Sequence, residues 1–207
     1  KKHVVLREDI EVLRASSNSL MPVGFEKQIP PEAMSNLLAF LTARGQFLPL
    51  DLSKIATISS DRGMFINRAA DVERLIFPDW EPKTFKGIPF HLTNPQGGTV
   101  NNIILLHGPL GGVTQKMPKA VKVLCNGPAR AIHLLSGVGG WSFPYARENT
   151  VSMIVRLHYV DGKTEDHPLK NGIHFADYIR RTDVPESEFA FGLRNQQIRY
   201  LAIYPHR

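Results

Sequence analysis

The sequence predicts a mainly β protein, a β-sandwich or jelly roll, preceded by a short α-helical segment. From Gly87 onward, apolar residues recur with a period of two, which is the pattern of strands that bury one face. Gly, Pro, Asn and Asp residues separate these runs, and no helical pattern lies between them. Asp161-Gly162 joins two alternating runs, and this dipeptide is the strongest short signal for a β-hairpin.

The clearest predicted helix begins at Pro31. Proline is tolerated in the first turn of a helix, and the carboxylate of Glu32 suits its positive end. Apolar residues then follow at helical spacing, and they are Ala33, Met34, Leu37, Leu38, Phe40 and Leu41. Gly45 is a natural C-terminal stop. A further short helical turn is expected within residues 71–76.

Eight strands are expected after Gly87, and their number without intervening helices favours a sandwich or jelly roll. They lie at residues 88–92, 102–107, 120–124, 129–135, 151–160, 164–169, 188–193 and 198–204. The chain is therefore expected to have three parts. Residues 1–45 form the helical part, residues 46–86 form a connection that packs on the sandwich, and residues 87–207 form the sandwich itself.

Composition indicates an ordinary soluble globular chain, with 43% hydrophobic and 21% charged residues among 207. The net charge of +6 is spread along the chain, and no basic run reaches four residues, so nucleic-acid binding is disfavoured. No apolar stretch approaches the roughly 20 residues of a membrane helix, so no membrane span is expected. Cys125 is the single cysteine, which excludes an internal disulfide, a cysteine-rich zinc site and a CxxCH motif within these residues.

A glycine-rich loop at residues 136–145 carries Trp141, Phe143 and Tyr145. It is not a phosphate-binding loop, because neither a Gly-Lys-Ser/Thr ending nor a helix follows. Flat aromatic rings suit the apolar faces of sugars, and binding residues often lie on loops of a rigid β scaffold. We therefore expect a flexible loop of stacking platforms. The alternative interpretation is that Trp141 fills the end of the sandwich.

The histidines around the predicted hairpin suggest a second hypothesis, a metal or substrate site made by His158, His167 and His174. A period of two places His158 with Arg156 on the more polar face of its strand. The spacing of the three histidines matches no zinc pattern, so histidines bonded to neighbouring strands or loops are the favoured interpretation.

The acidic residues form no catalytic pair. Glu165 and Asp166 point to opposite faces of their strand, and Asp177 is expected in a local network with Arg180 or Arg181. A glycosidase needs two carboxylates that flank a bond, roughly 5–10 Å apart, and nothing fixes such a geometry. The chain is therefore not expected to be an enzyme. A calcium ion on loop carboxylates and carbonyls stays an alternative.

Three motifs that belong together lie in the N-terminal part of the chain, Ser19-Leu20-Met21-Pro22, the preceding Asp9-Ile10 and the helix Asn36-Leu37-Leu38-Ala39-Phe40-Leu41. With these motifs, residues 10–43 resemble the end of a c-type cytochrome domain. This version resembles the haem-binding domain of large secreted proteins from planctomycetes and their relatives. The resemblance implies that Met21 is the axial iron ligand of a haem c in a longer protein. It also implies an upstream haem domain, redox partners, and a periplasmic or extracellular location. The preceding CxxCH of that family is missing here, so no cofactor is expected within the chain itself.

Residues 55–207 contain four further motifs, Phe77-Pro78-Asp79-Trp80, Ala131-Ile132-His133-Leu134-Leu135, Arg156-Leu157-His158-Tyr159-Val160-Asp161-Gly162 and Asn171-Gly172-Ile173-His174-Phe175-Ala176-Asp177-Tyr178. With these motifs, the segment resembles the C-terminal domain of the same proteins, and also galactose-binding-like jelly rolls appended to carbohydrate-active enzymes. This resemblance implies non-catalytic binding of carbohydrate. Trp141, Phe143 and Tyr145 would stack, and the residues expected to donate or accept hydrogen bonds are His158, His167, Asn171, His174 and Asp177.

Two alternatives to carbohydrate binding stay open. The first is a structural or docking module that holds partner domains around a haem electron-transfer protein. A buried Trp141 together with an exposed apolar patch elsewhere would favour it. The second is a metal-dependent enzyme that uses the histidines, and it is the less favoured of the two.

Overall fold

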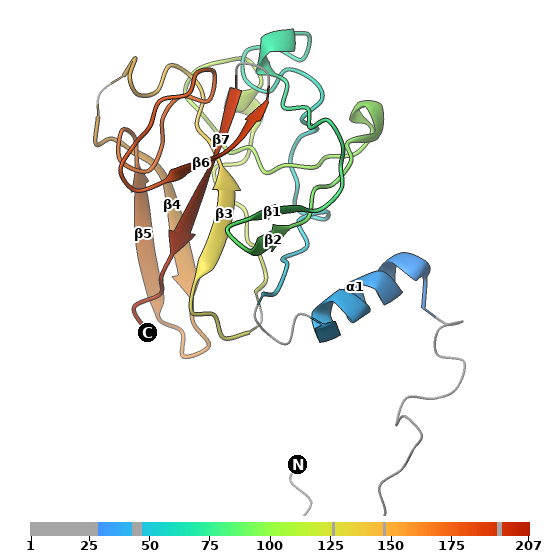
Figure 1. Ribbon diagram of the computed structural model, residues 1–207. Coiled ribbons are helices and arrows are strands. Elements are labelled where there is room, and N and C mark those ends of the chain that lie inside the picture. The colour runs from blue at the N-terminus through green and yellow to red at the C-terminus, as the bar shows by residue number, and fades with distance from the viewer. Residues whose placement is uncertain (1–28, 43–46, 126, 147, 194–195) are drawn as a thin grey trace, which may run out of the picture. The chain divides into compact units, whose positions relative to one another are not determined.

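Strands form where apolar and polar residues alternate, and the part of the chain that the structure describes contains seven of them. This computed structural model describes residues 29–42, 47–125, 127–146, 148–193 and 196–207. The strands are β1 (Lys83–Phe85), β2 (Ile88–Phe90), β3 (Ile132–Ser136), β4 (Val151–His158), β5 (Thr164–Lys170), β6 (Glu188–Leu193) and β7 (Gln196–Ile203). They form three antiparallel sheets, β1-β2, β3-β7-β6 and β4-β5 (Figure 1). The prediction of a β-rich fold with few helices is thus confirmed.

Helices are short and few within the described residues. The predicted helix is present as α1 (Pro31–Thr42). Three 3-10 helices follow, η3 (Asp71–Glu73), η4 (Gln96–Gly98) and η5 (Thr114–Lys116), and η3 lies where a helical turn was expected. The chain divides into two compact units, Lys1–Leu48 and Pro49–Arg207, and α1 belongs to the first. Met21, the predicted haem ligand, lies outside the described residues.

Two of the predicted strands are wrong, and β1 was missed. Residues 120–124 are mostly apolar but pair with no strand of the described residues, and within the predicted strand 102–107 only Ile103 pairs, in an isolated bridge with Ile58. Beside Ile103, the Asn102 side chain bonds the backbone at Ser60 N and Thr93 O, which competes with a regular ladder. β1 pairs with β2 through Lys86-Gly87, where both residues have positive φ as a tight hairpin turn requires.

The β4-β5 hairpin buries one face against the sheet of β3 and β7 (Figure 1). The register pairs Val155 with His167 and Met153 with Leu169, so these side chains share the inner face. The apolar core between the two sheets consists of Leu169, Phe175, Leu201 and Ile203, with Ile132, Leu134, Val138, Met153 and Val155 packed around it. Two sheets therefore face each other across an apolar layer.

A second apolar cluster covers the opposite face of the β3-β7-β6 sheet. Its buried members are Phe77, Leu193 and Ile198. The β1-β2 hairpin contributes Phe85, whose ring lies 5.0 Å from that of Tyr200 on β7 and 6.3 Å from that of Phe191 on β6. β7 is therefore buried on both faces, which makes it the central strand of the sheet.

Two buried polar residues on β7, Gln197 and Arg199, tie down the segment between β5 and β6. The Arg199 guanidinium donates to Ser187 O at 2.6 Å and Thr182 O at 3.0 Å. The Gln197 amide donates to Asp177 O at 2.8 Å and Arg180 O at 2.6 Å. Because the Gln197 bonds run from the most buried strand, they fix the position of Asp177.

Candidate functional site

The loop that follows β3 presents two aromatic side chains to solvent. Trp141 is 66% exposed and Tyr145 is 48% exposed. Their ring centroids lie 5.7 Å apart, and the ring planes meet at 83°, an edge-to-face arrangement. Phe143, the third predicted platform, is half-buried between them in sequence. Trp141 therefore does not fill the end of the sheet pair, which was the alternative interpretation of this loop.

Trp141 has a backbone φ of 63°, in the left-handed region that large side chains rarely adopt. Such a conformation costs on the order of 1–3 kcal/mol and persists only where the surroundings impose it. Strained residues of this kind gather at binding and catalytic sites. The positive φ of Trp141 therefore calls for contacts that hold the residues next to it.

The Asp177 carboxylate supplies the first of these contacts from below the loop. Asp177 is 2% exposed, and its Oδ2 accepts from the Ser142 backbone N at 3.1 Å and from the Ser142 hydroxyl at 3.4 Å. Its Oδ1 accepts from Ile179 N at 3.1 Å, and its own backbone N donates to Phe143 O at 2.8 Å. Both residues that follow Trp141 are thus bonded to Asp177.

Asn171, at the end of β5, supplies the second contact. Its Oδ1 accepts from Phe143 N at 2.9 Å, and its side chain is buried. Its backbone N donates to Thr150 O and its O accepts from Asn149 N, both at 2.8 Å. Asn171 and Asp177 were expected to hydrogen-bond a ligand, whereas the structure directs their side-chain oxygens to the loop backbone. They are positioning residues for the exposed aromatic pair.

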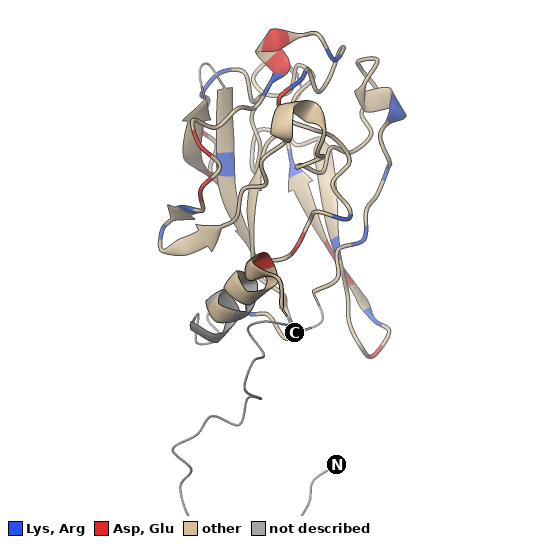
Figure 2. Cartoon of the chain, turned by 90° about the vertical axis from the view of Figure 1, so that its right-hand side faces the viewer, with Lys and Arg blue, Asp and Glu red and all other residues tan. Residues whose placement is uncertain are grey.

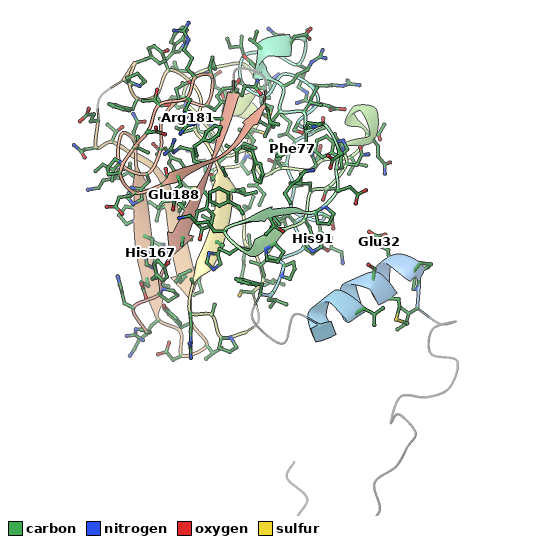
Figure 3. All side chains as sticks on the ribbon, viewed as in Figure 1. Glu32, Phe77, His91, His167, Arg181 and Glu188 are labelled. Carbon is green, nitrogen blue, oxygen red and sulfur yellow. The ribbon has the colours of Figure 1, made fainter. Side chains whose placement is uncertain are left out.

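The three predicted histidines do not converge on one point. His158 is exposed with Arg156 on the outer face of β4, as the period of two predicts. His167 lies on the inner face of β5 (Figure 3), with its Nε2 2.7 Å from Glu165 Oε1. His174 lies in the turn after β5, where its Nδ1 accepts from Lys170 N at 3.1 Å. Within the described ranges, no group of three or more His, Cys, Asp or Glu side chains is arranged to hold a metal ion.

Glu165 organises a separate cluster at the hairpin end of β4-β5. It faces inward and Asp166 faces outward, as predicted, and Asp166 pairs with Arg156 at 2.6 and 2.7 Å. The Glu165 carboxylate accepts from the Tyr159 hydroxyl at 2.6 Å and from His206 N at 3.1 Å. The Tyr159 bond is the main cause that holds the pKa of Glu165 below its usual value. This cluster fastens the segment after β7 to the hairpin.

Sequence reasoning missed three residues of the aromatic loop's surroundings, Ser142, Gln197 and Glu148. Ser142 and Gln197 hold Asp177 in place, and no sequence pattern marks such contacts between distant segments. Glu148 is exposed. A Cβ on Gly172 would lie 3.0 Å from Glu148 Cγ and 3.3 Å from the Phe143 ring, so Glu148 and Phe143 both pack over Gly172. Within the described part of the chain, no hydrogen bond or ion pair holds the Glu148 carboxylate.

Two half-buried histidines should make the protein less stable in weak acid. Burial lowers the pKa of His133 and His174 below their usual value, so the unfolded chain binds more protons as the pH falls from about 6.5. Stability that is full above about pH 6.5 should therefore decline toward the lower folded pKa values. Urea unfolding at pH 7.5, 6.5 and 5.5 measures this. The double variant His133→Gln/His174→Gln should show a flatter profile, and an equal slope in both proteins would contradict the assignment.

Comparison with protein-family models, with curated proteins and with solved structures gives no match to this chain. In the described residues, no helix is both long enough and apolar enough to cross a membrane. The features of the chain that bear on its function are therefore its own residues, above all the exposed pair Trp141 and Tyr145 and the buried Asp177 and Asn171 that hold their loop.

Proposed function

We propose that this chain is a non-catalytic carbohydrate-binding module in which Trp141 and Tyr145 stack on sugar rings. The supporting observation is that two exposed rings stand on a loop fixed by the buried Asp177 and Asn171. Aromatic rings combine a large apolar contact with a polar edge, which matches a sugar with apolar faces and hydroxyl rims. A loop already held in one conformation loses little entropy on binding.

The arrangement of charge supports a neutral ligand over a polyanion. Figure 2 shows acidic and basic residues dispersed over the strands and loops of Pro49–Arg207. Several pair locally, as Arg156 does with Asp166 and Lys86 with Glu188. A neutral, hydroxyl-rich ligand is bound by hydrogen bonds and stacking, and it does not need a surface patch of a single charge sign.

We also propose a fold type for this module and a larger protein to which it belongs. The two facing sheets support a β-sandwich of the galactose-binding-like jelly-roll type. The resemblance of the N-terminal residues supports a larger extracytoplasmic c-type cytochrome protein, periplasmic or extracellular, in which Met21 would bind haem. The sequence encoded upstream of Lys1 tests this setting, because a CxxCH motif there would establish the haem domain and its absence would argue against it.

A docking module for partner domains is the second candidate function. The observation that favours it is an apolar pair on the outer face of β4, Val151 and Ile154, each 53% exposed. Against it, Trp141 is exposed rather than buried, which is the property that separates the two hypotheses. If the variant Ile154→Ser no longer bound a protein partner but bound sugar as the wild type does, the docking function would be favoured.

Replacing Trp141 by glycine should weaken sugar binding at least tenfold without destabilising the fold. The substitution removes the stacking ring, which should weaken binding at least tenfold. It also relieves the positive φ, so the free energy of unfolding should rise by up to about 1 kcal/mol. Glycan-array binding followed by calorimetry, together with urea unfolding, measures both effects.

Tyr204 provides a matched control for this variant. It is 65% exposed and follows β7, whose last residues pair with the start of β3 rather than with its loop end. Tyr204→Ala should leave sugar binding unchanged. Binding by Trp141→Gly at wild-type strength, or no sugar bound by the wild type at all, would refute the proposed function.

A further inference from the structure

We propose that the aromatic loop takes one sugar ring at the end of a glycan, held in the corner between Trp141 and Tyr145, with Glu148 accepting its hydroxyl hydrogens. This inference rests on the proposed function and names its ligand class. It follows from three observations on the described residues: the angle between the two rings, the position of the exposed Tyr204, and the Glu148 carboxylate, which has no partner among those residues.

The ring angle excludes a flat binding platform. A packed polysaccharide surface presents many sugar rings in one plane, so a protein that binds it needs aromatic rings that share a plane. The planes of Trp141 and Tyr145 meet at 83° with centroids 5.7 Å apart. Two such rings form a corner, in which one ring stacks on the apolar face of a sugar and the other lines its side.

The platform does not continue along the protein. Among the described residues, the other aromatic side chain that is exposed to a similar degree is Tyr204. The loop begins at Ser136, which pairs with Arg199 on β7. Tyr204 lies five residues beyond Arg199, toward the start of β3, and five extended residues span about 17 Å. Among the described residues, a long glycan would thus find one stacking position and no second exposed aromatic ring in line with it.

Glu148 brings a carboxylate close to Phe143, the residue between the two exposed aromatic residues in sequence. Its Cγ and the Phe143 ring both lie over Gly172, and Phe143 is two residues from each of the exposed aromatic residues. The Glu148 carboxylate is exposed and has no bonding partner among the described residues. A free carboxylate can accept hydrogen bonds from two adjacent hydroxyls, which favours a sugar ring over a purely apolar ligand.

Calorimetry on the full 207-residue chain tests this inference with methyl β-galactoside, methyl β-glucoside and methyl N-acetyl-β-glucosaminide. The di- and trisaccharides of each sugar form the second arm, and sedimentation with microcrystalline cellulose and chitin forms the third. We expect one methyl glycoside to bind, its trisaccharide to bind within about threefold of it, and neither insoluble polymer to deplete the protein. A gain above tenfold from one to three rings, or binding to the polymers alone, would overturn the single-ring site.

The outcomes separate this inference from the function on which it rests. Absence of binding in all three arms refutes carbohydrate binding itself, whereas polymer binding refutes only the corner geometry. For the glycoside that binds, Glu148→Ala should weaken affinity about tenfold or more, and Glu148→Gln by less. Glu81→Ala, an exposed glutamate before β1, should leave affinity unchanged. Wild-type affinity in Glu148→Ala would overturn the role of that carboxylate.

Discussion

Replacing Arg199 by methionine should lower the free energy of unfolding by about 3–5 kcal/mol, the largest effect expected for a polar residue of this fold. Arg199 is 1% exposed, and its guanidinium donates to Ser187 Oγ and O and to Thr182 O within 3.0 Å. Methionine keeps much of the side-chain volume but donates nothing. The loss would therefore come from buried carbonyl oxygens left without a donor.

Urea unfolding of Arg199→Met and of Arg180→Met compares the same substitution at a buried and at an exposed arginine. The difference in the free energy of unfolding is therefore due to the buried contacts of Arg199. Arg180 is exposed in the neighbouring segment, so its replacement should change stability by less than about 0.5 kcal/mol. Arg199→Lys should fall between wild type and methionine, because one ammonium cannot reproduce the planar fork. Equal losses at positions 180 and 199 would show that the carbonyls of the β5–β6 segment do not depend on Arg199.

Much of the strand pattern could be predicted because alternation and turn residues are local properties. The β4-β5 hairpin follows from its two alternating runs and Asp161-Gly162, and the inward Glu165 and outward Asp166 follow from the same period. The apolar run at 120–124 was wrongly predicted as a strand, because an apolar run does not by itself supply a partner strand. Which strands pair across the chain, such as β3 with β7, depends on contacts between residues far apart in sequence.

In the candidate site, too, local features could be predicted and contacts between distant residues could not. Sequence reasoning found Trp141 and Tyr145, because aromatic residues in a glycine-rich loop are visible locally. It placed Asn171 and Asp177 near the same loop but expected them to meet a ligand, since nothing local reveals that Ser142 and Phe143 would take their hydrogen bonds. It also grouped histidines by proximity in sequence, whereas His158 and His167 lie on opposite faces of the hairpin.

Replacing Asp177 by asparagine should lower the free energy of unfolding by about 2–3 kcal/mol and weaken any sugar binding at the loop. Asparagine has nearly the same shape, but its amide NH2 would replace one of two oxygens that now accept from Ser142 N and Ile179 N. Whichever way the amide is turned, one of these two backbone donors would lose its acceptor, and Ser142 N is the buried one. Urea unfolding measures the loss, and Asp71→Asn, on an exposed side chain paired with Arg74, should change stability by less than about 0.5 kcal/mol.

The same substitution tests whether Asp177 imposes the strained backbone on Trp141. In the wild type, Trp141→Gly should be neutral or stabilising because it relieves a positive φ. Once Asp177→Asn has loosened the hold on Ser142, the loop can relax by itself, so the same Trp141→Gly change should gain less. A double-mutant cycle should therefore give a coupling of up to about 1 kcal/mol between positions 141 and 177, although among the described residues no hydrogen bond joins their side chains. A coupling near zero would mean that the conformation of Trp141 is set within residues 137–145 alone, and that the buried carboxylate stabilises the fold without shaping the site.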